Sequence, residues 1–426
     1  MKIPPVKGFR DVFPDETVHR RGIVSAAVGV LESYDFREVE LPLLERAALF
    51  SSSVGATTDI VEKEMYAFED RDGTVVALRP EGTASLVRAY TDAGLGRSEP
   101  EARFYYVGPM FRRERPQKGR FRQFTQIGAE CIGRADAAAD AEVICMAADI
   151  CEATGIASAR MEINSLGDGN CRPAYREALL AYGRERTGQL CENCRNRLER
   201  NPLRILDCKE ESCRVIAADA PQMSDFLCAG CKEHHGRVLD LLGACSVEVV
   251  ANPNMVRGLD YYCRTAFEII AEGLGAQDAI GGGGRYDGLV GALGGPDLAG
   301  VGFAFGVERM QMAAGGGAAA ETAEFVLAPL EESADGAALA LARRMRRGGM
   351  SVAVGTSARR LKVQMKKAAK AGARYVVIIG EAELASGRAS VRDMDEQRDY
   401  PACVPLDAAD AVAVSEAIKR AKDGEA

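Results

Sequence analysis

The stretch Phe111–Glu130 reads FRRERPQKGRFRQFTQIGAE. Its alternation predicts the end of one strand, Arg103–Phe111, and a second strand, Gln123–Glu130, joined by a basic loop. From Arg103 to Arg122 the chain holds seven lysines and arginines and one acid, although its formal net charge is -8. A concentrated positive loop on an acidic protein indicates a site for a polyphosphate or a nucleic acid. Composition alone would favour a solvated hairpin tip instead.

The size and composition of the chain are those of an ordinary globular protein. Its 426 residues have room for two or three domains, and 47% of them are hydrophobic and 27% charged. No run of 18 apolar residues occurs, so we expect no membrane span. The N-terminus MKIPPVKGFRDVFPDE lacks the apolar core and cleavage site of a secretory signal. With thirteen cysteines and no sign of export, we expect a cytoplasmic protein with reduced thiols.

A low-complexity stretch, Ala313–Ala323 (AAGGGAAAETA), predicts a flexible linker that divides the chain. Residues 324–426 beyond it alternate apolar strands with amphipathic helices, which predicts a small three-layer α/β domain. One of these helices, Ala358–Ala371, carries Lys362 and Lys366 on a basic face. Such a face is either solvated surface or a contact for RNA. The strands expected in this part are Phe325–Ala328, Ser351–Val354, Tyr375–Gly380 and Arg388–Asp393.

The longer part of the chain mixes long helices with strands that alternate in the antiparallel manner. Good strand candidates there are Val247–Val250, Ala266–Ile270 and Val301–Phe305. A separate insert, about Cys171–Ala244, is helical in pattern and rich in cysteine. Near the N-terminus, a helix over Val18–Ser33 is expected to precede a strand over Phe36–Pro42.

Four further segments contain unusual combinations of glycine, charge and tyrosine. They are LRPEGTAS at Leu78–Ser85, VRGLDYYCRTA at Val256–Ala266, AIGGGGRYDGL at Ala279–Leu289 and GFAFGVERM at Gly302–Met310. The third lacks the Gly-Lys-Ser/Thr ending of a Walker loop and the spacing of a dinucleotide fingerprint. Each segment alone is explained as well by a turn or a structural ion pair.

Taken together and in order, these segments resemble class II aminoacyl-tRNA synthetases, and in particular the histidyl-tRNA synthetase family. Phe111–Glu130 is similar to motif 2, Gly302–Met310 to motif 3, and Val18–Pro42 has the form of motif 1, the dimer-interface element. The segments from Val256 and Ala279 resemble the two histidine-specific motifs. Gly8–Glu16 and Tyr375–Met394 resemble the family's N-terminal entry and anticodon-binding domain, so the resemblance covers nearly the whole chain.

The resemblance implies an α+β catalytic domain with an antiparallel sheet of the class II synthetase type over residues 1–312. It further implies a C-terminal α/β anticodon-binding domain over 324–426, with residues 171–244 as a helical insert and 313–323 as a linker. The implied activity converts L-histidine and ATP to histidyl-adenylate and pyrophosphate, and then transfers histidine to the 3' end of tRNA(His). The implied cofactor is Mg²⁺, and the implied protein partner is a second copy of the chain in a homodimer.

The site residues come from the same resemblance. Arg112 and Arg257 are expected to stabilise charge at the α-phosphate, since a guanidinium binds phosphate oxygens in two places and stays charged. The expected ATP-binding residues are Arg112, Glu114, Arg120, Phe124 and Arg309. The expected histidine-binding residues are Glu81, Thr83, Gln126, Glu130, Tyr261 and Tyr262. The expected tRNA-binding residues are Arg115, Gln117, Lys362 and Lys366.

Two departures and two alternatives accompany this interpretation. Arg113 and Thr125 stand where the family commonly has histidine, which leaves details of the motif 2 loop open. One alternative is the regulatory paralogue of ATP phosphoribosyltransferase, which usually lacks the C-terminal domain. The other is a zinc-containing RNA-binding protein without activity. Only three histidines occur, none of them in a motif, which argues against a Ser-His-Asp hydrolase or a histidine-ligated metalloenzyme.

The cysteine pairs of the insert form a separate pattern. Two CxxC units, Cys191–Cys194 and Cys228–Cys231, predict one structural zinc site with four thiolate ligands. The alternative is a reduced helical insert with incidental thiols. The resemblance does not require a zinc ion.

Overall fold

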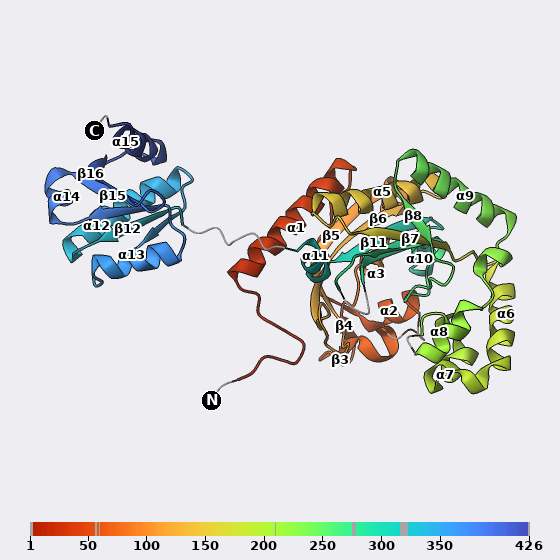
Figure 1. Ribbon diagram of the computed structural model, residues 1–426. Coiled ribbons are helices and arrows are strands. Elements are labelled where there is room, and N and C mark those ends of the chain that lie inside the picture. The colour runs from red at the N-terminus through yellow and green to blue at the C-terminus, as the bar shows by residue number, and fades with distance from the viewer. Residues whose placement is uncertain are drawn as a thin grey trace. The chain divides into compact units, whose positions relative to one another are not determined.

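The computed structural model describes residues 3–55, 58, 60–208, 210–274, 278–315 and 323–424. The chain divides into two compact units, Met1–Ala319 and Ala320–Ala426, which are described separately (Figure 1). Of the predicted linker, the stretch 316–322 lies outside the described residues. The first two residues of the predicted linker, Ala313 and Ala314, are helical and end α11 (Val307–Ala314).

The first unit is built on an eight-stranded sheet whose interior is antiparallel, as expected. Its strands, in spatial order, are β1 (Arg37–Glu38), β5 (Ala102–Phe111), β6 (Gln123–Ile132), β11 (Gly300–Gly306), β10 (Ala279–Arg285), β9 (Cys263–Ile270), β7 (Arg160–Ser165) and β8 (Val249–Ala251). The two edge pairs, β1 with β5 and β7 with β8, are parallel. Only Arg37 and Glu38 of the expected strand Phe36–Pro42 belong to the sheet.

Strands β5 and β6 form the hairpin that the opening segment predicts. They pair without interruption from Ala102 opposite Ile132 to Phe111 opposite Gln123. The basic loop therefore begins at Arg112, where the ladder ends, and the second strand places Gln126 and Glu130 on the same face because they are an even number of residues apart. The alternation along β6 thus determines which of its side chains lie on the same face of the sheet.

Strand β10 consists largely of the glycine run of AIGGGGRYDGL, where sequence analysis expected no strand. It pairs with β11 on one side and β9 on the other. A Cβ at position 283 would lie 2.0 Å from the carbonyl oxygen of Gly302. Only glycine allows this close approach of neighbouring backbones, which explains a strand with poor intrinsic strand propensity.

Helices cover both faces of this sheet (Figure 1). One face packs against α1 (Pro14–Ser33), α5 (Ala137–Ala153), α9 (Ala229–Ala244) and α11. The other face packs against α3 (Thr83–Asp92) and α10 (Leu289–Ala292). Beside α3 lie α2 (Ala47–Ser53), α4 (Leu95–Ser98) and a small sheet of β2 (Leu44–Arg46), β4 (Val75–Leu78) and β3 (Tyr66–Glu69).

The helical insert is confirmed between β7 and β8. It contains α6 (Arg172–Glu185), α7 (Glu192–Arg200) and α8 (Glu211–Ala218) before α9 returns to the sheet. A buried charge network holds α9 in place, because Asp140 of α5 accepts hydrogen bonds from Arg285 and contacts His234 Nε2 at 2.7 Å. Arg285 and Asp140 are both fully buried, so removing either partner would leave an uncompensated charge in the core.

The second unit has the expected three layers. Its sheet has the order β13 (Val352–Val354), β12 (Phe325–Pro329), β14 (Tyr375–Ile379), β15 (Arg388–Asp393) and β16 (Arg398–Pro405). One face packs against α12 (Glu332–Arg347) and α15 (Ala411–Asp423), and the other against α13 (Leu361–Lys370); α14 (Glu381–Ser386) follows β14. In neither unit does a described helix combine the length and apolarity needed to cross a membrane.

Candidate active site

A cavity of about 240 Å³ opens on the face of the large sheet that carries α3. Its walls come from β5, β6, β10, β11, the start of α3 and the start of α11. The predicted site residues that line it are Glu81, Thr83, Arg112, Glu114, Arg120, Phe124, Gln126, Arg257, Tyr261, Tyr262 and Arg309. Segments more than 200 positions apart in sequence therefore meet in one cavity, as the joint motif pattern requires.

One end of the cavity contains carboxyl, amide and hydroxyl groups. Glu81 is 3% exposed and caps α3, because its carboxylate accepts hydrogen bonds from the backbone N–H groups of Thr83 at 2.8 Å and Ala84 at 2.9 Å. Burial raises the pKa of the Glu81 carboxyl. The side-chain oxygen of Gln126 has no hydrogen-bond partner among the described residues, which leaves an acceptor for a ligand.

Glu130 lies next to this end without lining the cavity itself. Its two oxygens accept hydrogen bonds of 2.6 Å, one from the hydroxyl of Thr83 and one from that of Tyr286. Burial raises the pKa of the Glu130 carboxyl to about 8. Tyr286 is not among the predicted site residues, although it lies in the glycine-rich segment Ala279–Leu289. Its ring also makes an edge-on contact with Tyr261, at 5.8 Å between ring centroids.

Two adjacent tyrosines form an aromatic wall. The rings of Tyr261 and Tyr262 lie 4.7 Å apart between centroids. Burial raises the pKa of both phenols, so both stay neutral at physiological pH. A further tyrosine in the cavity wall, Tyr106 of β5, was not singled out from the sequence, because its strand carries several similar residues.

The basic loop supplies the opposite end of the cavity. Nε of Arg112 donates to the carbonyl oxygen of Pro80 at 2.8 Å, and the guanidinium stands over the ring of Phe124 at 5.3 Å. Arg120 donates to Glu114 at 2.8 Å. These contacts orient two arginines toward the cavity without neutralising Arg112, whose nearest carboxylate oxygen, on Glu114, is 4.0 Å away.

Arg257 enters the cavity from the loop before β9. Its Nη1 donates to Glu268 Oε1 at 2.6 Å, and its guanidinium stands 5.5 Å from the centroid of the Tyr262 ring. Gly282 of β10 makes room for it, since a Cβ at position 282 would lie 2.8 Å from Nη1. The glycine run thus serves both the sheet and the cavity.

Arg309 lies on the first turn of α11, which begins after the glycine-rich strand β11. Burial and the neighbouring Arg120 lower the pKa of the Arg309 guanidinium. The preceding residue, Glu308, accepts the backbone N–H of Thr125 at 3.0 Å and pairs with Arg20 at 3.2 Å. This contact fixes the start of α11 against β6, and sequence analysis did not foresee it.

The four predicted tRNA-binding residues lie elsewhere. Arg115 and Gln117 are exposed on the β5–β6 loop and do not line the cavity. Lys362 and Lys366 are exposed on α13 in the second unit, while Gln364 and Ala368 of that helix are buried.

A larger cavity of about 620 Å³ adjoins the first, because Arg257, Leu259 and Tyr262 line both. Besides Arg257, four further arginines stand in its wall: Arg172, Arg176, Arg200 and Arg204.

The prediction of one zinc site from the two CxxC units is wrong. Cys191 and Cys194 cluster with Cys208 and Cys213, whereas Cys228 and Cys231 cluster with Cys171 and Asp168. The physical reason is that the two units open different helices, α7 and α9, and each helix start faces a different partner segment. All thirteen cysteines are free.

Comparison with known proteins matches both units. The sequence profile described as histidyl-tRNA synthetase matches residues 8–310, and the profile described as anticodon binding domain matches residues 324–419. The chain is 44% identical over 402 residues to a histidine–tRNA ligase of Syntrophotalea carbinolica, covering 94% of this chain and 96% of the relative. It is 46% identical over 393 residues to that of Geobacter metallireducens, covering 92% and 95%.

Two solved structures are also similar to this chain. The crystal structure of apo histidyl-tRNA synthetase from S. aureus superposes with a TM-score of 0.78 at 32% identity, covering 96% of this chain and 98% of that one. An ATP phosphoribosyltransferase regulatory subunit/histidyl-tRNA synthetase from Bacillus halodurans has a TM-score of 0.66 at 20% identity, covering 89% and 99%. At that identity, the second likeness shows the fold alone.

Proposed function

Because this chain belongs to the histidyl-tRNA synthetase family and is a histidine–tRNA ligase that uses ATP, we propose that the 240 Å³ cavity is where it activates histidine. The observation that carries the proposal is the convergence of eleven predicted site residues on that one cavity. A carboxylate, an amide and tyrosines stand at one end and Arg120 and Arg309 at the other, while Arg112 and Arg257 also contact residues of the first end. This division suits an amino acid and a triphosphate bound end to end.

The histidine end is proposed to recognise both polar parts of the substrate. Glu81, Thr83 and Gln126 receive the ammonium group, for which a buried carboxylate and an unpaired amide oxygen are suitable acceptors. Tyr262, which lines the cavity, pairs with a ring nitrogen, and Tyr261 packs beside the ring. Glu130 acts on the ring through the Thr83 and Tyr286 hydroxyls that it holds. An amino acid without such nitrogens would leave buried polar groups unpaired, at a cost of about 1–3 kcal/mol each.

The arginine end is proposed to bind ATP and to stabilise the charge of the reaction. An oxygen of the histidine carboxylate attacks the α-phosphorus, and the bond to pyrophosphate breaks. Arg112 and Arg257 bind the α-phosphate oxygens, on which negative charge concentrates in the transition state. Arg309 and Arg120 hold the rest of the triphosphate, Glu114 orients Arg120, and Phe124 packs against the adenine.

Mg²⁺ is proposed to arrive with ATP. Among the described residues, the groups that could hold a metal ion through protein ligands alone include none of the cavity carboxylates. Mg²⁺ commonly binds to one or two carboxylates and to substrate phosphates, so the triphosphate supplies most of its ligands.

The remaining assignments concern the tRNA and the assembly. We place Arg115 and Gln117 at the acceptor end of tRNA(His) and Lys362 and Lys366 at the anticodon arm, since all four are exposed.

We also propose a cytoplasmic homodimer. Free thiols support the location, and exposed apolar side chains near the motif 1 segment support the dimer: Leu43, Leu44, Phe68 and Val75. Light scattering should then give twice the 45.6 kDa chain mass.

Steady-state kinetics of two variants test the end-to-end arrangement. In ATP–pyrophosphate exchange, Gln126→Ala should raise the KM for histidine about tenfold and leave that for ATP nearly unchanged. Arg120→Ala should raise the KM for ATP about tenfold and leave that for histidine nearly unchanged. If both variants raised the same KM, or if neither changed any, the assignment of the two ends would be wrong.

A further inference from the structure

All seven cysteines of the insert gather in two clusters, and the other six of the chain belong to neither. The four-thiol cluster comprises Cys191, Cys194, Cys208 and Cys213, and the mixed cluster comprises Cys171, Cys228, Cys231 and Asp168. Within each cluster, the four ligand atoms lie within 4.8 Å of one another. This segregation indicates that the cysteines of the insert act in two groups of four ligands.

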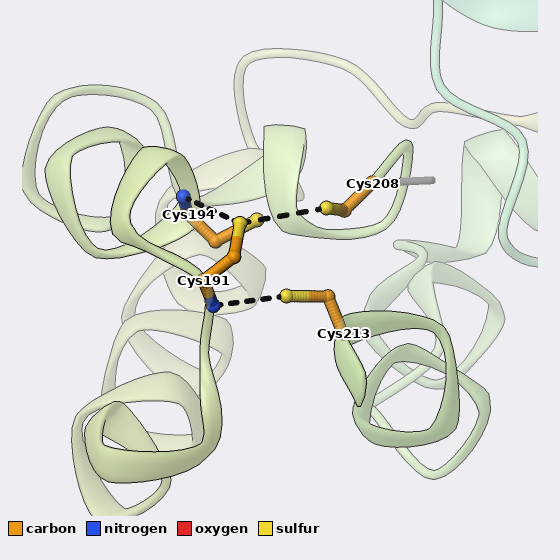
Figure 2. A group of neighbouring side chains, drawn as sticks. All are labelled: Cys191, Cys194, Cys208 and Cys213. Atoms are coloured by element: carbon orange, nitrogen blue, oxygen red, sulfur yellow. Dashed lines mark hydrogen bonds between the residues drawn. The ribbon is translucent and has the colours of Figure 1, made fainter. Parts of the chain in front are cut away.

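The sulfur spacing of the four-thiol cluster fits a tetrahedral metal ion. Figure 2 shows its four side chains converging, with Cys191 and Cys194 on one segment opposite Cys208 and Cys213. The Sγ atoms of Cys191 and Cys208 are 3.8 Å apart. Four thiolates at a Zn–S distance of about 2.3 Å stand about 3.8 Å from one another. A disulfide would need about 2.05 Å.

The two clusters are built in the same way. In each, a CxxC unit opens a helix, and its first cysteine donates its backbone N–H to a sulfur across the cluster. Cys191 donates to Cys213 at 3.2 Å, and Cys228 donates to Cys171 at 3.1 Å. Cys194 also donates to Cys191 at 3.4 Å. N–H groups at helix starts stabilise thiolates, the form in which cysteine binds metal.

The small core of the insert gives a reason for such sites. Its cluster of fourteen buried residues includes four of the cysteines: Cys171, Cys194, Cys213 and Cys231. The helices around it are short, with nine residues in α7 and eight in α8. Small modules with limited apolar burial usually depend on disulfides or a structural metal. Free thiols grouped with a shared centre favour the metal.

We propose that the insert is a zinc module with two separate structural sites, one in the four-thiol cluster and one in the mixed cluster. Soft thiolate ligands in tetrahedral groups select zinc over magnesium or calcium, and a carboxylate oxygen completes zinc sites as well. Both sites are closed by four protein ligands. They hold α6, α7, α8 and α9 together and leave no position open for catalysis.

Metal analysis of the full-length, untagged chain tests this proposal directly. Protein produced with zinc supplied, kept reduced and dialysed, should contain two zinc ions per chain by mass spectrometry. One zinc ion per chain would overturn the two-site proposal. Iron in place of zinc, or no metal in folded protein, would overturn it entirely.

Variants assign the two ions to the two clusters. Cys208→Ser should lower the zinc content from two ions to one by emptying the four-thiol cluster. Cys171→Ser should do the same for the mixed cluster. The matched control is Cys245→Ser, an exposed cysteine outside both clusters, which should retain two. If Cys208→Ser and Cys171→Ser also retained two ions, the assigned ligands would be wrong.

Cobalt spectroscopy keeps the test decisive where a serine variant fails to fold. Wild-type chain refolded with Co²⁺ should show the intense visible absorption of tetrahedral cobalt–thiolate, saturating at two equivalents. Zinc should then displace it. Saturation at one equivalent, or the weak spectrum of octahedral cobalt, would contradict the two closed sites.

Discussion

Nη1 of Arg257 lies 2.6 Å from Oε1 of Glu268, so one carboxylate on β9 holds one corner of a guanidinium at the cavity wall. Nε of the same arginine has no hydrogen-bond partner among the described residues. The ion pair therefore fixes the direction of Arg257 while leaving donors for a ligand. An arginine held in this way stabilises developing charge without having to reorganise during the reaction.

Replacing Arg257 by alanine should chiefly lower the rate of adenylation. Loss of one preorganised donor at a developing charge typically costs about 10²–10³-fold in rate. Single-turnover formation of adenylate, measured beside tRNA affinity, separates the two effects. Arg160→Ala, which breaks an exposed arginine–glutamate pair on the same sheet, is the control and should change neither. A variant at 257 that lost only tRNA affinity would contradict the assigned role.

Replacing Gly282 by alanine should have a similar but smaller effect. A Cβ at 282 would lie 2.8 Å from Nη1 of Arg257 and 2.8 Å from the backbone carbonyl oxygen of Phe267 on β9, so both the guanidinium and the neighbouring strand must shift. Displacement of such a group should slow adenylation between about 10-fold and 100-fold. Gly291→Ala serves as the control, since a Cβ there meets nothing within 4 Å. Equal rates for both variants in pyrophosphate exchange would mean that Gly282 serves the backbone alone.

The carboxyl of Glu130 should make stability depend on pH. Its pKa is about 8 in the folded chain against an ordinary 4.5, so the folded state holds the proton more tightly. Its contribution to the free energy of unfolding is fully present below pH 4.5 and is lost as the pH rises through about 8. The loss has an upper limit of roughly 1.4 kcal/mol per pH unit.

Urea denaturation of wild type and Glu130→Gln at about pH 5 and about pH 8 checks this expectation. Wild type should lose stability relative to the variant as the pH rises, because glutamine does not titrate. Parallel stability curves over that range would show that Glu130 has an ordinary pKa.

Reversing the charge of Lys362 and Lys366 should weaken tRNA binding without touching activation. Both side chains are exposed on α13. If they contact phosphates, the double glutamate variant should raise the KM for tRNA about tenfold and flatten its salt dependence. The matched control is Lys419→Glu with Arg420→Glu on α15 of the same unit, where both side chains are also exposed. The same loss in both double variants would indicate a general effect of net charge.

Sequence patterns predicted best what depends on local alternation. The β5–β6 hairpin, α1 and α13 follow from apolar periodicity, and most of the cavity residues follow from short motifs near strand ends. Several strands escaped prediction, among them β7, β10 and β16, and the last two did so for opposite reasons. In β10 the glycines are required by the close approach of β9 and β11, which only the folded sheet reveals. In β16 Pro401 argues against a strand, but the strand lies at the sheet edge, where proline is tolerated.

Contacts between residues far apart in the sequence were the other feature that sequence patterns did not predict. Spacing identified both CxxC units and grouped them wrongly, because Cys208, Cys213 and Cys171 join them only through helix packing. Tyr286 escaped notice for the same reason: its hydroxyl meets Glu130 across 156 positions.

The most direct test of the central claim is ATP–pyrophosphate exchange by the purified chain with each of the twenty amino acids in turn. Histidine alone should support exchange, because only its ring nitrogens satisfy the buried groups around Glu130 and Tyr262. Exchange with none of them by folded protein, or equal exchange with another amino acid, would contradict the proposed site.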